Sequence, residues 1–149
     1  MAYITNQDII DRVGAAAALQ LTTDPPATEP DQDVLTEVAG AAEGEANGYL
    51  AKRYAVPVDL TAHADLAATL KSFVLDIAVY RLMSRRPPAA EHHEKSRSNA
   101  IEWFLRIVKG DVHLPAEVTP ASTTSDDPVP VAEYSPSSGL GGADGIRHW

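Results

Sequence analysis

The chain contains no cysteine, and aromatic residues make up only 6% of its 149 residues. Without cysteine, no disulfide framework, cysteine-ligated metal or cysteine nucleophile is available. The longest uncharged stretch near the start, residues 13–23, is too short and too polar to span a bilayer. The opening residues have neither a basic start nor an apolar run. We therefore expect no signal peptide and no membrane anchor.

Motifs that carry chemistry are also missing. His92 and His93 are adjacent, so they do not share a helix face, and no second ligand follows at the four-residue spacing of a zinc helix. Gly139, Gly141 and Gly142 have no strand before them and no helix after them, so they do not form a phosphate-binding loop. We expect no catalytic residue, no metal and no cofactor, and we interpret the protein as a non-enzyme.

The net charge of −9 is unevenly distributed along the chain. Residues 1–48 carry nine acids and one base, residues 49–110 six acids and ten bases, and residues 111–149 six acids and one base. A chain divided by sign can associate with itself, although plain solvated faces explain the division equally well. We expect acidic positions in 24–45 to meet basic positions in 52–97 across subunits.

The same charge bears on nucleic acid. Affinity for DNA comes mostly from neutralising phosphates, and a strongly negative protein opposes this. We therefore expect no specific DNA recognition. An acidic inner surface would instead suit a protein that surrounds DNA without holding it.

Residues 64–86 predict one long helix. They contain no Gly or Pro, and Pro87 and Pro88 end the helix because the residue before a proline avoids the helical region. Large apolar residues recur along the stretch at helical spacing: Leu66, Leu70, Phe73, Val74, Ile77 and Leu82. This apolar face is too wide to be covered by one neighbour. The pattern predicts an all-α fold, a small helical bundle around one long central helix.

The other helices follow from capping and periodicity. Thr5 begins a short helix that Gly14 ends, and a second short helix runs over residues 15–21. Two longer helices follow, one from Asp31 or Asp33 to about residue 54 and one over about 89–109. Thr61 or Asp65 is expected to cap the central helix. The residues expected to be buried together are Phe73, Ile77, Leu82, Ile101, Phe104 and Leu105.

Two features indicate close packing. Gly40, Gly44 and Gly48 fall four apart, and each weakens a helix by about 1 kcal/mol relative to Ala, so something should pack against them. A helix of the same chain is the favoured partner, and a neighbouring subunit comes second. Asp76 and Arg81 on the central helix, with Arg53 between two tyrosines, predict a buried polar network or an inter-subunit pair rather than catalysis.

Residues 115–149 differ in composition from residues 1–114. They are rich in Pro, Ser, Thr, Gly and Asp, which cannot build a core, so we expect a helical domain over 1–114 and an extended tail over 115–149. Residues 129–134 could form a short strand, confined to an edge by Pro130. The tail is expected to dock on a partner or a neighbouring subunit, with wrapping of its own domain as the alternative. The expected docking residues are Val129, Val131, Tyr134, Ile146, Arg147 and Trp149.

Four segments resemble a known family. They are AYITNQDIIDRVG at 2–14, YLAKRYAVPV at 49–58, DIAVYRL at 76–82 and AIEWFLRIVKGDVHL at 100–114. Together they resemble the Mu-like head–tail connector (adaptor) family of tailed phages, which is often labelled a domain of unknown function.

The resemblance implies a structural protein in the neck of the virion, made in the host cytoplasm. Such adaptors assemble as a homo-oligomeric ring, a dodecamer, beneath the phage portal protein. The ring extends the DNA channel and offers its other face to a tail-side completion or stopper protein. Two alternatives stay open: a small helical regulatory binding module without catalytic activity, and an enzyme whose site forms only between subunits.

Overall fold

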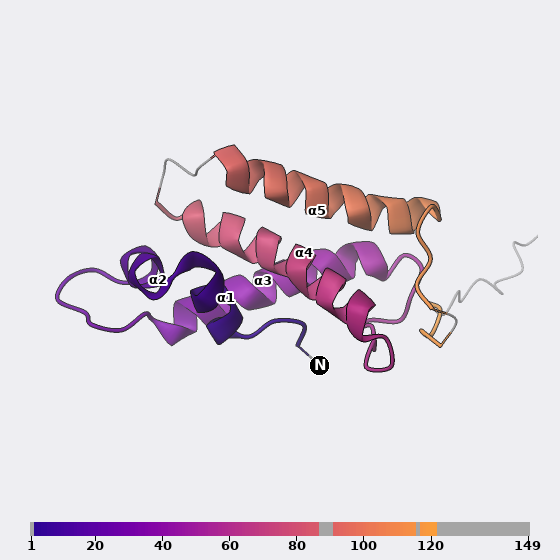
Figure 1. Cartoon of the computed structure of the whole chain (residues 1–149), viewed down its shortest axis with the longest axis horizontal. Helices are drawn as coiled ribbons and strands as arrows, with labels where there is room; N and C mark the ends of the chain where they lie inside the picture. Colours follow the sequence, from indigo (N-terminus) through magenta and orange to yellow (C-terminus); the bar gives the residue numbers. More distant parts are fainter. Residues whose placement is uncertain (1, 87–90, 116, 122–149) are drawn as a thin grey trace, which may run out of the picture.

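The computed structural model describes residues 2–86, 91–115 and 117–121. These residues form five helices and no sheet, which confirms the predicted all-α fold (Figure 1). The helices are α1 (Asn6–Val13), α2 (Ala15–Thr22), α3 (Gln32–Leu50), α4 (Ala64–Met83) and α5 (Glu91–Lys109). Within the described residues, the only extended pairing is an antiparallel bridge between Tyr54 and Pro120.

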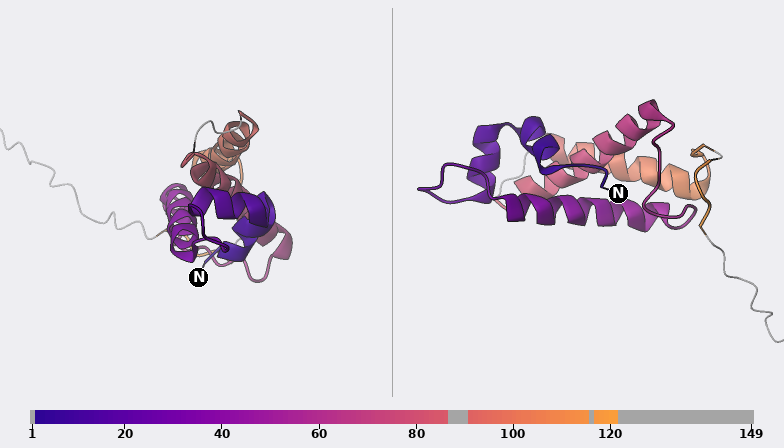
Figure 2. Two further views of the ribbon diagram at one scale, coloured as in Figure 1. Left: turned by 90° about the vertical axis from the view of Figure 1, so that its left-hand side faces the viewer. Right: turned by 90° about the horizontal axis from the view of Figure 1, so that it is seen from below.

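Helix α4 lies at the centre of the bundle. It contacts each of the other four helices. The long helices α3 and α5 pack along it, and the short pair α1 and α2 covers the remaining side (Figures 1 and 2). The sequence prediction that residues 64–86 organise the fold is therefore confirmed.

Local signals set most helix boundaries. The Thr5 hydroxyl accepts from the Asp8 amide at 3.2 Å, and the Asp8 carboxylate accepts from the Thr5 amide at 2.8 Å, so both groups of the capping box are in place. Gly14, with φ 88°, separates α1 from α2. Asp31 caps α3 by accepting from the amides of Asp33 and Val34.

Three expected boundaries were wrong. Helix α4 ends at Met83 rather than at residue 86, because the amides of Arg85 and Arg86 donate to Leu82 and Met83 and form a turn before Pro87. Helix α3 ends at Leu50 rather than near residue 54, because the Arg53 amide donates back to Leu50 and tightens the chain into a turn. Helix α4 begins after His63 and has no side-chain cap. Thr61, one of the two expected caps, instead donates to Asp59 in the preceding loop.

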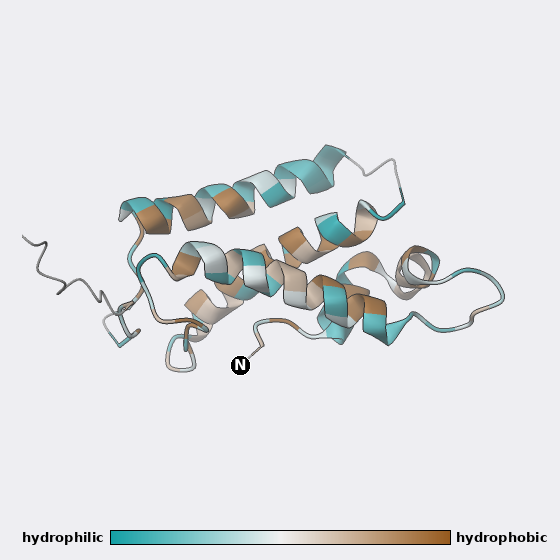
Figure 3. Ribbon diagram, turned by 180° about the vertical axis from the view of Figure 1, so that it is seen from behind, coloured by the Kyte–Doolittle hydropathy of each residue, from teal (hydrophilic) through white to brown (hydrophobic). Residues whose placement is uncertain are grey.

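The core contains half of the six residues expected there. Ile77, Leu82 and Phe104 are fully buried, and Phe104 stacks on Tyr49 with ring centroids 6.0 Å apart. Phe73 and Ile101 are only half-buried, and Leu105 is 37% exposed, so their predicted burial was wrong. The buried stripe of α5 is Ala100, Phe104 and Ile107. Because α5 packs on one side of the bundle, apolar residues on its flank stay outside the core. Hydrophobic and hydrophilic residues alternate along the α5 ribbon (Figure 3).

The glycines of α3 do not face a neighbour in the same chain. No atom lies within 4 Å of the place where a Cβ would stand on Gly40, Gly44 or Gly48. All three are exposed, because α3 lies at the edge of the bundle and turns this face outward. The favoured expectation, a helix of the same chain packed against them, was therefore wrong.

The described start of the tail packs on the helical body. The Ala55 amide donates to Thr119 at 2.8 Å, and the Ala121 amide donates to Arg53 at 2.9 Å. Val118 is buried as part of the core. The division at residue 114 stays a prediction, but core packing continues past it. The short strand expected at 129–134 lies outside the described residues.

None of the helices that the structure describes combines the length and apolarity needed to cross a membrane.

Two adjacent residues test the position of α5. Phe104→Ala should lower the free energy of unfolding by roughly 3–5 kcal/mol, because Phe104 is fully buried. Leu105→Ala should cost less than about 1 kcal/mol, because Leu105 lies on the exposed flank. Chemical denaturation monitored by circular dichroism measures both. Equal losses in the two variants would show that the helix is rotated from the orientation described.

Candidate functional site

Glu45 joins the three long helices. Its carboxylate on α3 accepts from Arg81 of α4 at 2.6 Å and from Arg97 of α5 at 2.7 Å. The Glu45 side chain is only 14% exposed. The Arg97 guanidinium also lies over the Tyr80 ring, 5.1 Å from its centroid. A largely buried carboxylate with two charged donors fixes the relative position of α3, α4 and α5.

The predicted polar residues of the central helix have partners within their own chain. Asp76 pairs with Arg12 of α1 at 2.6 Å, and Arg81 pairs with Glu45. Asp76 and Arg81 therefore bind different helices rather than each other. The Nε atom of Arg81 is buried and has no partner among the described residues. Glu45, which the sequence reasoning missed, is the group that both Arg81 and Arg97 need.

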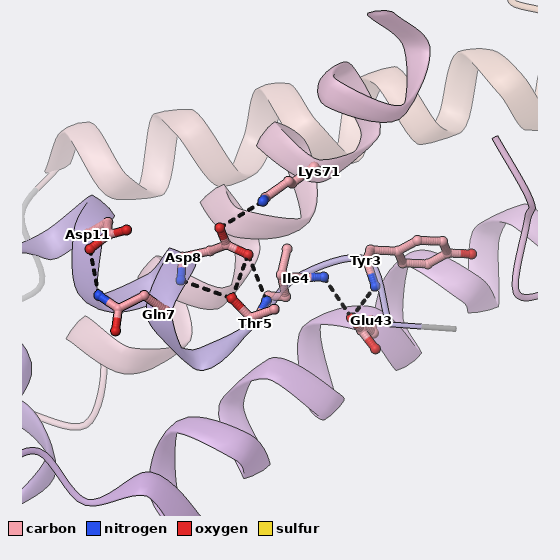
Figure 4. Close-up of polar contacts among 8 residues, drawn as sticks. All are labelled: Tyr3, Ile4, Thr5, Gln7, Asp8, Asp11, Glu43 and Lys71. Carbon is pink, nitrogen blue, oxygen red and sulfur yellow. Dashed lines mark hydrogen bonds and ion pairs between the residues drawn. The ribbon is translucent and has the colours of Figure 1, made fainter. Parts of the chain in front are cut away.

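The amino-terminal segment is tied to α3 and α4 (Figure 4). Glu43 accepts from the amides of Tyr3 and Ile4 at 2.6 and 3.0 Å. Burial raises the pKa of the Tyr3 hydroxyl, which accepts from the Val58 amide at 2.8 Å. The hydrogen bond from Lys71 lowers the pKa of Asp8, 2.7 Å away. These contacts tie the amino-terminal segment to the helices, and Tyr3 and Lys71 also line a cavity of about 230 Å³.

Arg53 lies where the tail leaves the body. A Cβ on Gly110 would come 2.5 Å from Nη1 of Arg53, so the guanidinium occupies the space that the glycine leaves. Gly110 has φ 89°, a conformation that glycine adopts without strain. The neighbouring Tyr54 hydroxyl accepts from the Leu114 amide at 3.0 Å. The turn after α3 thus holds the segment after α5 in place.

A cavity of about 460 Å³ lies between the loop 55–63 and residues 117–119. His63 and Glu117 line it, with Nε2 of His63 3.1 Å from the Glu117 carboxylate. A hydrogen bond from its own backbone amide, and then His63, lower the pKa of Glu117. The Thr61 hydroxyl, which also lines the cavity, donates to Asp59.

A smaller cavity of about 220 Å³ lies beside Asp76 and is lined by His92 and His93. Burial and the neighbouring His92 lower the pKa of His93, while Asp76 opposes this shift. Within the described residues, no group of three or more His, Asp or Glu side chains could hold a metal ion. The docking residues predicted in the tail lie outside the described residues: Val129, Val131, Tyr134, Ile146, Arg147 and Trp149.

These features define a class of protein: a small all-α domain whose polar side chains join its helices to one another. The chain matches the bacteriophage Mu Gp36 family over residues 3–133, and it belongs to that family. A search of curated proteins found no match. The family is not a known enzyme family, and membership indicates a virion-associated phage protein of the structural type. The resemblance to a Mu-like phage family is thus confirmed.

Removing the Glu45 carboxylate tests its joining role. Glu45→Ala should lower the free energy of unfolding by about 1–3 kcal/mol, because it leaves two partly buried guanidinium groups without their acceptor. The matched control is Asp24→Ala, which breaks the exposed pair with Arg86 and should cost less than about 1 kcal/mol. Urea denaturation of the three proteins measures the difference. If Glu45→Ala lowers the free energy of unfolding no more than Asp24→Ala does, Glu45 does not hold the three helices together.

Proposed function

We propose that this chain is a head–tail connector of a tailed phage, which forms a homo-oligomeric ring between the capsid portal and the tail. The match to the bacteriophage Mu Gp36 family carries this proposal. The described architecture supports it, because charged side chains such as Glu45, Arg81 and Arg97 join the helices of an all-α domain to one another. A ring of twelve copies would extend the channel through which DNA passes, and its tail-side face would receive a completion or stopper protein.

Ion pairs within one chain reduce the number of charged residues that remain for contacts between subunits. Arg86–Asp24, Arg81–Glu45 and Arg97–Glu45 join the acidic range 24–45 to the basic range 52–97 within one chain. The charges of these pairs are therefore neutralised within one chain and need no neighbouring subunit. Other exposed charges in the same ranges form no ion pair in the described part of the chain: Glu29, Asp33, Glu37, Lys52, Arg85 and Lys95. Contacts between subunits are proposed to use these.

The tail is proposed as the arm that docks the ring on the portal or on a neighbouring subunit. Its described root is fixed on the body by Val118 and by the bonds of Thr119 and Ala121. The tail residues after Ala121 therefore continue from a point that is fixed on the helical body. Val129, Val131 and Tyr134 would add a strand to an exposed sheet edge, and the terminal Trp149 would fill a pocket.

A deletion of residues 122–149 tests the tail. The cut spares Val118, which belongs to the core, so the truncated chain should keep its helical circular dichroism and its melting temperature. It should fail to join portal-bearing heads, whereas the full chain joins them. Head binding by the truncated chain contradicts the docking arm. Failure of the full chain to bind heads contradicts the connector function, and loss of folding on truncation favours a tail that wraps its own domain.

Binding of duplex DNA provides a separate test. The purified full chain should bind DNA weakly near physiological salt, because its net charge of −9 opposes the release of counterions. A mobility-shift assay over a series of salt concentrations measures this, with a basic DNA-binding protein as the positive control. A tight complex that dissociates as salt rises would point to direct nucleic-acid binding instead of passive enclosure.

A further inference from the structure

An apolar stripe on α5 lies outside the core. Leu105 is 37% exposed, and Ile101 and Val108, on the same helix face, are half-buried. Arg97, one turn before Ile101 on this face, pairs with Glu45 of α3. The stripe therefore runs along the side of α5 that faces α3.

Helix α3 carries two exposed glycines close in sequence to Glu45, the residue that pairs with Arg97. Gly48 lies one turn after Glu45, and Gly44 precedes it. No atom lies within 4 Å of a Cβ built on either glycine. A larger residue at these positions would strengthen the helix by about 1 kcal/mol. We call the surface formed by Gly44, Gly48, Ile101, Leu105 and Val108 the α3–α5 face.

The two ends of the α3–α5 face carry mostly opposite charge, although Lys95 is also exposed near the acidic end and Asp111 near the basic end. Helices α3 and α5 run in the same direction (Figure 1). Asp33, Glu37 and Glu94 are exposed toward their amino ends, and Lys52 and Lys109 are exposed at their carboxyl ends. Within the described part of the chain, none of these five side chains forms an ion pair. Roughly 20–30 Å separates the acidic and basic positions of α3 at 1.5 Å per residue, so they cannot pair with each other.

We propose that the α3–α5 face is covered by a second copy of this chain, with the acidic end of one copy against the basic end of the next. A second copy supplies both signs of charge as well as an apolar surface, whereas DNA or an anionic membrane would meet only the basic end favourably. A contact that joins unlike ends is heterologous, and repeated contacts of this kind close into a ring when the rotation permits. The inference deepens the proposed ring and rests on it.

Two substitutions test the face in the full-length protein. Leu105→Asp places a charge on the apolar stripe at a residue that is already partly exposed. Gly48→Leu fills the space beside the stripe and should leave the melting temperature equal or higher, because Leu favours the helix more than Gly. The matched control is Val56→Asp, since Val56 is 38% exposed, lies in the loop before α4 and is not one of the five residues of this face.

Mass photometry and analytical ultracentrifugation measure self-assembly against protein concentration and salt. The wild type and Val56→Asp should assemble alike, and their assembly should weaken as salt rises. Leu105→Asp and Gly48→Leu should each raise the concentration required for assembly roughly tenfold or more while staying folded. A wild type that stays monomeric, or two face variants that assemble like the wild type, would overturn the inference.

Head binding separates this inference from the connector function. If the face variants assemble normally and still join portal-bearing heads, the connector survives and the α3–α5 face is not its subunit contact. If the wild type assembles through this face but never binds heads, the self-contact stands and the connector function fails.

Discussion

The apolar surface of α4 is the constraint on which the rest of the fold depends. Seven residues of this helix are buried, and they are distributed around most of its circumference: Leu70, Val74, Leu75, Ile77, Ala78, Val79 and Leu82. No single neighbour can cover such a surface, so α1, α2, α3 and α5 must all pack against it. The few polar positions left on α4 then face its neighbours, where Asp76 meets Arg12 and Arg81 meets Glu45.

Local signals in the sequence predicted most of the helices. The buried side of α5 and the ion-pair partners could not be predicted, because contacts between distant residues determine them. Thr5 and Gly14 mark the limits of α1 within a few residues of themselves, so that helix was predicted closely. Leu105 could not be placed, because α5 has apolar residues on two flanks and only the position of α4 decides which flank is buried. The sequence contains one signal for Glu45. It precedes the buried Ala46 on a helix whose apolar side must face the bundle, and an acid at such a position needs a charged partner. Which arginines supply that partner depends on the packing of α4 and α5.

The unevenly distributed charges of the chain have two separate roles. Part of it holds the helices of one chain together, as Glu45 and Asp24 do with arginines from other elements. The remainder lies exposed at opposite ends of the α3–α5 face, where it is available to a neighbour. Membership of the bacteriophage Mu Gp36 family provides the context, a virion-associated protein of the structural type. A domain with a packed core, an apolar stripe outside it and an anchored tail root is consistent with the proposed ring subunit.

A reconstruction of the portal vertex in virions of the phage that encodes this chain tests the central claim most directly. The account predicts a closed ring of copies of this five-helix domain between the portal and the tail, with the α3–α5 face of each copy buried against the next. The ring would surround the DNA channel without base contacts. A neck built entirely from other proteins, with this domain elsewhere in the particle or missing from it, would contradict the account.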